Sequence, residues 1–237
     1  MAKEKTPPQK QKSATKTVVR QKIEELDTYK VAERKRRMRR LVAKLQKMYP
    51  DESHTILRWG NEWELMVAVQ LSAQCTDERV NMVTESLFKK YPTLDDYADA
   101  RWQAFAQDIR SVTYFNNKAR NIISAAKLVR ERFDGNLPKT MLEMLLLPGV
   151  ARKTANVVLG NAHGVVEGIA VDTHVKRFVK RFDLSDAKTA DGIERDLMQL
   201  LPKKDWYLFT YLVIAYGRDV GRARGYDPAL DPLQRLA

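Results

Sequence analysis

The sequence predicts an all-α fold. Apolar residues recur at helical spacing along most of the chain, and no segment of useful length alternates between apolar and polar residues with the period of two that a half-buried strand requires. Proline and glycine interrupt the periodic segments, for example at Pro50, Pro92, Pro148–Gly149 and Pro202. These observations together predict helices of about 10–15 residues joined by short polar connections.

The N-terminal segment divides into two parts. Residues 1–27 are expected to form a disordered basic tail, because the stretch to about residue 18 is rich in Lys, Gln, Thr and Pro and has almost nothing to bury. Such a tail is either a non-specific DNA arm or a solubilising terminus. A helix is expected from about residue 28, with its apolar face formed by Met38, Leu41, Val42, Leu45, Met48 and Tyr49. The Lys and Arg residues of 34–40 then form either a solvated face or a stripe that faces phosphates.

Further helices follow along the chain. Thr76 is expected to cap a helix, and Thr93 with Asp96 has the spacing of a capping box. Apolar stripes at helical spacing predict four more helical faces. The residues of these stripes are Val80, Val83 and Leu87; Ala119, Ile122, Ile123, Ala126 and Val129; Ile193, Leu197, Leu200 and Leu201; and Leu208, Tyr211, Leu212 and Ala215.

Composition limits the function classes. The chain has 237 residues with 42 Lys and Arg against 30 Asp and Glu, a net charge of +12, and a pI of about 9.7. This excess suits a polyanionic partner, first nucleic acid and second an anionic membrane. A single cysteine, Cys75, excludes an intramolecular disulfide and any metal site built from several thiolates. We expect no signal peptide and no membrane span, and hence an intracellular protein.

Residues 142–160 carry the strongest motif. A helix is expected to end in Leu145-Leu146-Leu147, Pro148-Gly149 turns the chain, and a second helix starts near Arg152. A tight hairpin of this kind points backbone N–H groups outward, and the helix that follows adds the positive end of its dipole. Together they form a cradle for a DNA phosphate that does not depend on base sequence. The alternative is an ordinary αα-hairpin whose turn contains glycine.

This segment and four others give the chain a resemblance to the endonuclease III family of helix–hairpin–helix DNA glycosylases. The other strings are LSAQCTDERVN at 71–81, FNNKARNI at 115–122, GIAVDTHVKRFVKR at 168–181 and Tyr216-Gly217-Arg218. The resemblance implies a two-lobed fold with the active site in the cleft between the lobes. One lobe would be a helical barrel over about 50–171, and the other would combine 28–49 with 172–237.

The resemblance also implies an activity and its residues. Lys153 corresponds to the family's nucleophile and Asp172 to its catalytic carboxylate, which together imply a bifunctional DNA glycosylase and abasic-site lyase that removes oxidised pyrimidines from duplex DNA. An amine suits this chemistry because it can attack C1′ of the sugar and form a Schiff base. Seen alone, Lys153 is a solvated helix lysine and Asp172 is a helix N-cap. His174 is expected to be structural.

DNA contacts are implied for eight residues: Gln74, Val112, Tyr114, Gly149, Ala151, Arg152, Thr154 and Arg218. Gln74 would enter the gap left by the flipped nucleotide, and the loop 112–115 would form a wedge from the other side. Three positions depart from the family pattern. Ala151 replaces the second glycine of the hairpin, Thr113 stands where glycine is usual, and Tyr114 is bulkier than the usual leucine. Tyr114 is either this wedge or a core aromatic, and Phe115 is expected in the core.

The largest departure concerns a cofactor. The family typically ends in four cysteines that hold a [4Fe–4S] cluster, and the corresponding positions here are Gly221, Pro228, Asp231 and Ala237. None supplies a thiolate, so we expect no cluster. Tyr226, Leu230, Leu233 and Leu236 are expected to anchor the segment instead. The resemblance leaves room for a monovalent cation at the hairpin. The expected partner is duplex DNA with a damaged base or abasic site. We expect the protein to be a monomer and not to bind a membrane.

Other functions stay open at this stage. The same fold could act on a mismatched thymine, a pyrimidine dimer or abasic sites only. A non-catalytic DNA-binding protein is a rival from another class, although phosphate binding alone needs no acid such as Asp172 in the cleft. A basic protein that binds RNA or a membrane surface would not explain the hairpin.

Overall fold

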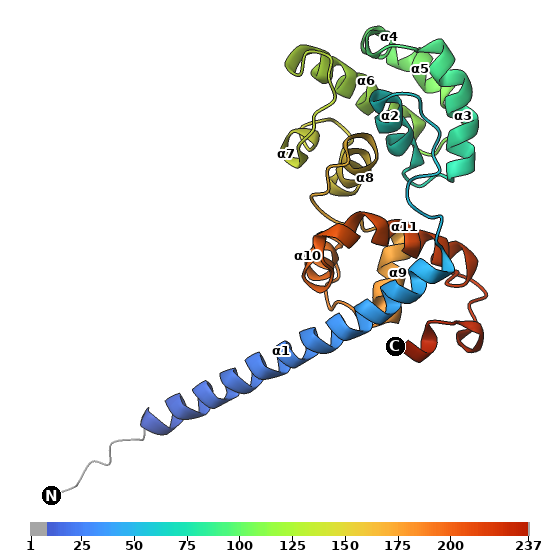
Figure 1. The fold of residues 1–237 in the computed structure, drawn as a ribbon. Coiled ribbons are helices and arrows are strands. Elements are labelled where there is room, and N and C mark those ends of the chain that lie inside the picture. Colours follow the sequence, from blue (N-terminus) through green and yellow to red (C-terminus); the bar gives the residue numbers. More distant parts are fainter. Residues whose placement is uncertain (1–8, 237) are drawn as a thin grey trace, which may run out of the picture.

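The computed structural model describes residues 9–236, with side chains from residue 27 onward. The described chain contains eleven α-helices and two 3₁₀ helices and no strand, which confirms the all-α prediction. Figure 1 shows two groups of helices, one above the other, and a long N-terminal helix that projects from the lower group. Buried apolar side chains form two separate clusters, one in each group. We call these groups the first lobe (residues 57–163) and the second lobe (27–49 and 169–236).

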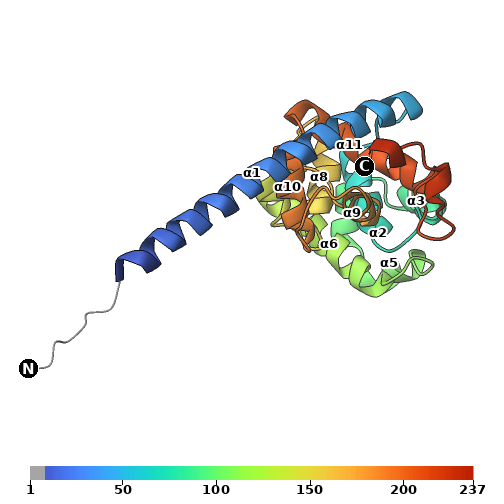
Figure 2. The same cartoon turned by 90° about the horizontal axis from the view of Figure 1, so that it is seen from below.

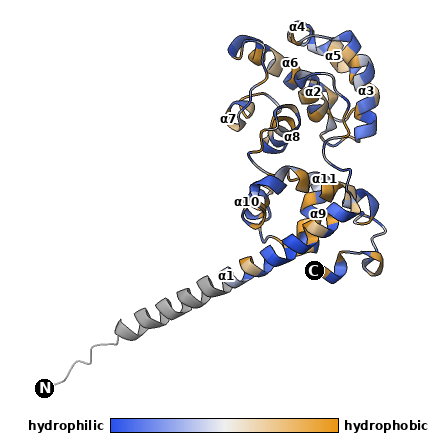
Figure 3. Ribbon diagram, viewed as in Figure 1, coloured by the Kyte–Doolittle hydropathy of each residue, from blue (hydrophilic) through white to orange (hydrophobic). Residues whose placement is uncertain are grey.

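The first lobe is built around a buried helix. Its helices are α2 (Glu62–Ser72), α3 (Asp77–Lys90), α4 (Leu94–Asp99), α5 (Trp102–Asp108), α6 (Phe115–Arg132), α7 (Met141–Met144) and α8 (Arg152–His163). Eight of the eleven residues of α2 are buried, and Figure 3 shows the hydrophobic colour on this helix in the middle of the lobe. A helix that is apolar on every side must lie inside a core. The other helices pack around it.

Local capping signals position several of these helices. Thr76 accepts a hydrogen bond from the backbone N–H of Arg79 at the start of α3, as expected. Thr93 and Asp96 form the expected capping box at α4, where each side chain accepts a bond from the backbone of the other. Such caps satisfy N–H groups that have no partner within the helix. The boundaries of these helices therefore follow from short sequence signals.

The second lobe joins the two ends of the chain. It contains the C-terminal part of α1 (Gln9–Met48), α9 (Thr173–Arg181), α10 (Ala190–Leu200), α11 (Lys203–Asp219), η1 (Pro228–Leu230) and η2 (Gln234–Leu236). The expected apolar face of α1 is confirmed, because Met38, Leu41 and Leu45 are fully buried in the second cluster. Ile169 and Val171 also belong to this cluster, so the chain has entered the second lobe a few residues before the expected boundary at 171.

The N-terminal tail differs from the prediction. Residues 1–8 lie outside the described residues, but residues 9–27, expected to be disordered, form the first part of α1. No glycine or proline occurs between Pro8 and Pro50, and Ala, Gln, Lys, Glu and Arg favour helix. Low apolar content predicts that a segment is not buried, and it does not exclude a helix. Figures 1 and 2 show α1 projecting well beyond the second lobe.

The basic run of α1 also differs from a solvated face. Arg34 is buried, and its guanidinium binds the carboxylates of Asp183 at 2.7 Å and Asp186 at 2.9 Å. Arg37 donates to the backbone oxygen of Phe182 at 2.8 Å. These arginines attach α1 to the turn after α9 and are not free to bind phosphates. Arg36, Arg39 and Arg40 remain exposed.

Candidate active site

A groove with an empty volume of about 1650 Å³ lies between the two lobes. Lys153 and Thr154 line it from α8 of the first lobe, and Asp172 and His174 line it from the start of α9 in the second lobe. Gln74, in the loop after α2, lies in the same lining. The structure therefore brings both residues that the sequence singled out as catalytic into one groove, although they come from different lobes.

Lys153 is exposed in the first turn of α8, directly after the hairpin. Gly149 has the positive φ of +77° that makes glycine necessary in this turn. Ala151, in contrast, has a φ of −99° and is the extended N-cap of α8. Alanine therefore causes no strain at the position where the family usually has a second glycine. A monovalent cation at this hairpin stays a prediction.

The hairpin is held against the buried helix of the first lobe. The side-chain amide of Gln70 donates to the backbone oxygen of Pro148 at 3.1 Å, and Gln70 itself is buried. A Cβ atom at Gly149 would lie 2.9 Å from the Cβ of Asn121 and 3.0 Å from Oε1 of Gln70. The absence of a side chain thus lets the turn approach α2 and α6 closely. This contact fixes the start of α8 and with it the position of Lys153.

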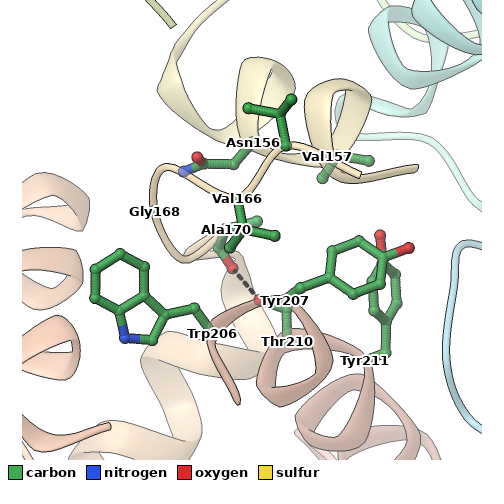
Figure 4. A pocket seen from close by; sticks show the side chains of 10 residues that line it. Asn156, Val157, Val166, Gly168, Ala170, Trp206, Tyr207, Thr210 and Tyr211 are labelled. Carbon is green, nitrogen blue, oxygen red and sulfur yellow. Dashed lines mark hydrogen bonds between the residues drawn. The ribbon is translucent and has the colours of Figure 1, made fainter. Parts of the chain in front are cut away.

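Asp172 is the N-cap of α9, as one reading of the sequence expected. Its Oδ1 accepts a hydrogen bond from the backbone N–H of Val175 at 2.8 Å, and the side chain is half-buried. The segment that leads to it is anchored on both sides. The hydroxyl of Thr210 donates to the oxygen of Ala170 at 3.2 Å (Figure 4), and the N–H of Ile169 donates to Glu194 at 3.2 Å. The carboxylate is therefore held rigidly at the groove.

His174 lies beside both candidate catalytic residues. Burial lowers the pKa of its imidazole below the ordinary value; the positive charges of Arg177, Arg218 and Lys153 act in the same direction, and Asp172 opposes them. The ring contacts Arg177 through Nδ1 at 3.2 Å. It also fills the space that a Cβ at Gly217 would occupy. This packing explains the glycine of the Tyr216-Gly217-Arg218 string and supports the expectation that His174 is structural.

The two loops expected to enter DNA lie at the edge of the first lobe. Gln74 is exposed and has a φ of +56°, and Tyr114 is 64% exposed with a φ of +55°. Tyr114 is therefore not a core aromatic, whereas Phe115 packs partly buried against the first cluster. Val112 differs from the expectation of a DNA contact. Its side chain is only 3% exposed because it packs in the first core cluster below the loop.

Two arginines expected to bind DNA form ion pairs between the lobes. Arg218 on α11 binds Asp77 of α3 at 2.6 Å and is exposed at the groove. Arg152 on α8 binds Glu194 of α10 through two hydrogen bonds of 2.7 and 2.9 Å. The guanidinium of Arg152 is therefore engaged within the protein. Its contact with DNA, like those of the other expected residues, stays a prediction.

Glu194 is a buried residue to which no sequence motif pointed. Its carboxylate accepts bonds from Arg152, from Asn156 at 2.9 Å and from the backbone of Ile169. A Cβ at Gly168 would collide with Oε1 of Glu194. One buried carboxylate thus joins the hairpin helix to the segment that carries Asp172. Its partners lie 25 to 42 residues away, which is why the local pattern around Glu194 did not reveal it.

The C-terminal segment does not fit an iron–sulfur cluster. Asp231, at one of the expected cluster positions, is buried and accepts hydrogen bonds from the hydroxyls of Tyr216 at 2.6 Å and Tyr226 at 2.7 Å. The guanidinium of Arg181 stacks 3.5 Å from the centre of the Tyr226 ring. Among the described residues, no group of three or more His, Cys, Asp or Glu side chains is arranged to hold a metal ion. The four positions that correspond to the family's cysteines carry no thiolate donor in this chain.

The apolar anchors of this segment agree only in part with the expectation. Leu233 is fully buried in the second cluster and Leu236 packs against it. Leu230 was expected to anchor the segment but is 77% exposed, because it ends the short η1 helix on the outer side. Within the described part of the chain, no helix combines the length and the apolar character needed to cross a bilayer.

Comparisons with known proteins agree with this geometry. Residues 67–203 match the model of the HhH-GPD superfamily of base excision DNA repair proteins. Endonuclease III of Synechocystis sp. is 47% identical over 82% of this chain and 89% of its own length. Endonuclease III of Bacillus subtilis is 43% identical over 81% of this chain and 88% of its own length.

Solved structures give the same result. The structure of a non-covalent endonuclease III–DNA complex has a TM-score of 0.81 at 40% identity and covers 86% of this chain and 94% of that chain. A trapped endonuclease III–DNA covalent intermediate also has a TM-score of 0.81 at 40% identity, with 85% and 94% covered. A thermostable thymine-DNA glycosylase, 17% identical with a TM-score of 0.70, shares the fold. The chain belongs to the endonuclease III family of the HhH-GPD superfamily.

Proposed function

We propose that this chain is a bifunctional DNA glycosylase and abasic-site lyase of base excision repair that removes oxidised pyrimidines from duplex DNA. The observation that carries the proposal is the meeting of an exposed amine, Lys153, and a fixed carboxylate, Asp172, in one groove between two lobes. Family membership supports it, since the relatives named above are endonucleases III and two of the similar structures contain DNA. The preference for oxidised pyrimidines rests on the family resemblance alone.

The hairpin supplies the contact with the DNA backbone. No side chain caps the first turn of α8, whereas Thr76 and Asp172 cap the first turns of α3 and α9. The N–H groups at the start of α8 are thus available to a phosphate, and the helix dipole favours the negative charge. A phosphate held there would place the neighbouring nucleotide near Lys153. We propose that Gly149, Ala151 and Thr154 take part in this contact.

The chemistry follows from the amine and the carboxylate. The amine of Lys153 attacks C1′ of the flipped nucleotide and a C1′–N bond forms. The bond to the base breaks, and the base leaves with its electron pair and takes up the proton that the attacking nitrogen loses. Asp172 stabilises the positive charge that develops on the sugar. Opening of the sugar ring gives a Schiff base. Removal of the C2′ proton then breaks the C3′–O bond and releases the 3′ phosphate by β-elimination.

The central test is covalent trapping by borohydride on a duplex with one abasic site. Lys153→Ala should abolish the trapped adduct, because the Schiff base needs the amine. Lys176→Ala is the matched control, since Lys176 is an exposed lysine on α9 that lines the same groove. Normal trapping by Lys153→Ala, or loss of trapping by Lys176→Ala alone, would overturn the assignment of the nucleophile.

Asp172 needs a variant that separates catalysis from capping. Asparagine caps helices as well as aspartate does, so Asp172→Asn keeps the bond to Val175 and the start of α9. We expect base release to fall by at least about a hundredfold, in the range of a lost electrostatic or acid–base group. An unchanged rate of base release would show that the carboxylate serves only as a cap.

A panel of lesion duplexes tests the substrate class. Oxidised pyrimidines should be released fastest, and faster release of a mismatched thymine or a pyrimidine dimer would replace the proposal by that activity. Iron analysis and absorption near 400 nm test the proposed absence of a cluster, and stoichiometric iron would refute it. We also propose that the protein binds DNA as a monomer, which gel filtration of the complex would test.

A further inference from the structure

The two loops that the proposed function inserts into DNA both have strained tips. We call residues 72–76, after α2, the first rim loop and residues 110–114, before α6, the second rim loop. Gln74 and Tyr114 adopt left-handed backbone conformations that residues other than glycine rarely take. Such strain persists only where the surroundings hold it. Neighbouring groups must therefore hold Gln74 and Tyr114 in these conformations.

A buried lysine holds the first rim loop. Lys118 lies in the first turn of α6 and is only 7% exposed. Its ammonium donates to the backbone oxygens of Leu71 and Ala73, both at 2.7 Å, and lies 3.5 Å from the hydroxyl of Thr113. The two oxygens belong to the end of α2, where carbonyl groups lack partners within the helix. Lys118 thus attaches the first rim loop to the helix that begins at the second.

Thr113 supplies a direct bond between the two rim loops. Its hydroxyl lies 2.8 Å from the backbone oxygen of Gln74 and 3.3 Å from that of Ala73. A hydroxyl has a single proton to donate, and the shorter distance assigns it to Gln74. Thr113 is also the neighbour of Tyr114 in the chain. The bond therefore connects the backbone of one inserted residue to the residue adjacent to the other.

We infer that Thr113 and Lys118 are positioning residues that join the two rim loops into one rigid wedge, with Gln74 and Tyr114 set at a fixed spacing before DNA arrives. The inference rests on the proposed function, because it assigns to these loops the insertion into damaged DNA. A wedge that is already ordered loses less conformational freedom on binding, so more of the contact energy remains for the flipped state.

The test compares affinities for two duplexes, one with a tetrahydrofuran abasic analogue and one undamaged, for the full chain and for Thr113→Val and Thr113→Ser. Valine keeps the shape of threonine and loses the hydroxyl, and serine keeps the hydroxyl. We expect Thr113→Val to lower the preference for the damaged duplex about fivefold, the effect of one hydrogen bond. Affinity for undamaged DNA should stay unchanged, because phosphate contacts at the hairpin are intact, and serine should restore the preference.

A second readout follows the wedge itself. With 2-aminopurine opposite the analogue, binding of the wild-type protein should raise its fluorescence as Tyr114 and Gln74 separate the base from its neighbours, and Thr113→Val should reduce this rise. A general loss of folding would lower both affinities together, whereas the wedge affects only the damaged duplex. Lys118→Met should reduce the preference further. If it does not fold, which circular dichroism would show, the Thr113 pair decides alone.

The outcomes separate the two proposals. If Thr113→Val retains the wild-type preference and the wild-type fluorescence rise, the rigid wedge is wrong even when borohydride trapping succeeds. If the wild-type protein shows no preference for the damaged duplex and no trapped adduct, the proposed function itself fails. If the wild-type preference is present but valine and serine lower it equally, the hydroxyl bond does not position the loops and the inference is again overturned.

Discussion

Replacement of Asp231 by alanine should destabilise the second lobe strongly. The buried carboxylate accepts three hydrogen bonds, from the hydroxyls of Tyr216 and Tyr226 and from the backbone N–H of Leu233 at 2.9 Å. Through them it connects α11 to the segment that follows it. Because this segment lacks the cysteines of an iron–sulfur cluster, these polar bonds and buried Leu233 hold it in place.

The magnitude follows from the three bonds. A hydrogen bond to a charged group contributes about 1.5–3 kcal/mol, and bonds that share one acceptor are not additive. Arg181 still donates to the hydroxyl of Tyr216 at 2.9 Å in the variant, so that oxygen keeps one partner. We therefore expect Asp231→Ala to lower the free energy of unfolding by about 3–4 kcal/mol, a large part of the 5–15 kcal/mol typical of a folded domain.

Equilibrium unfolding in urea, followed by circular dichroism, measures this loss. Asp227→Ala is the matched control, because Asp227 lies in the same segment but is exposed, and its side chain accepts a single hydrogen bond in the described structure, from the backbone N–H of Ala229. Its loss should stay at about 1 kcal/mol or less. If Asp231→Ala loses no more than Asp227→Ala, the three bonds do not stabilise the segment and the reasoning from the structure is wrong.

Three further predictions follow from other sites. Gly149→Ala should lower the free energy of unfolding in urea by about 1–2 kcal/mol, because φ is +77° and the new Cβ would crowd Asn121. It should also weaken binding to a DNA duplex, measured by fluorescence anisotropy. Unchanged binding would contradict a close-packed hairpin. Glu194→Gln should cost about 1–3 kcal/mol, since it leaves Arg152 without its charged partner, and wild-type stability would contradict this. Hydrogen bonds from Arg34 and then Lys30 lower the pKa of Asp186 to about 2. The contribution of this carboxylate to the free energy of unfolding is therefore present above about pH 4 and is lost as the pH falls through about 2. Acid unfolding followed by circular dichroism measures it, and an Asp186→Asn variant with the same curve as wild type would refute the prediction.

The features that the sequence predicted correctly depend on residues close to one another in the chain. The caps at Thr76 and Thr93 and the turn at Gly149 each involve groups within three residues of one another. Backbone geometry over such distances follows from the residue types alone. The same holds for the helical faces, because burial repeats with the helix period. Asp172 as an N-cap is another local feature that the sequence predicted correctly.

Interactions between distant segments were not predictable in the same way. Arg34 looked like part of a basic surface, but its acidic partners lie about 150 residues further along the chain. Leu230 and Leu233 have similar side chains, yet only Leu233 is buried, since the turn after η1 decides which of them faces the core. Thr113 stood out only as a departure from the family pattern, and its hydrogen bond was not predictable because the acceptor belongs to a loop 39 residues earlier.

The two ion pairs between the lobes should respond differently to salt concentration. The first lobe is tied to the second by Arg218–Asp77, which lines the groove, and by Arg152–Glu194 on the hairpin side. The side chains of the first pair are 42% and 29% exposed; in the second pair the Arg152 side chain is 35% exposed, but the side chain of Glu194 is only 5% exposed. Dissolved ions therefore weaken the first tie well before the second. Rising ionic strength should loosen the molecule unevenly, with the hairpin side still fastened after the α3–α11 side has been released.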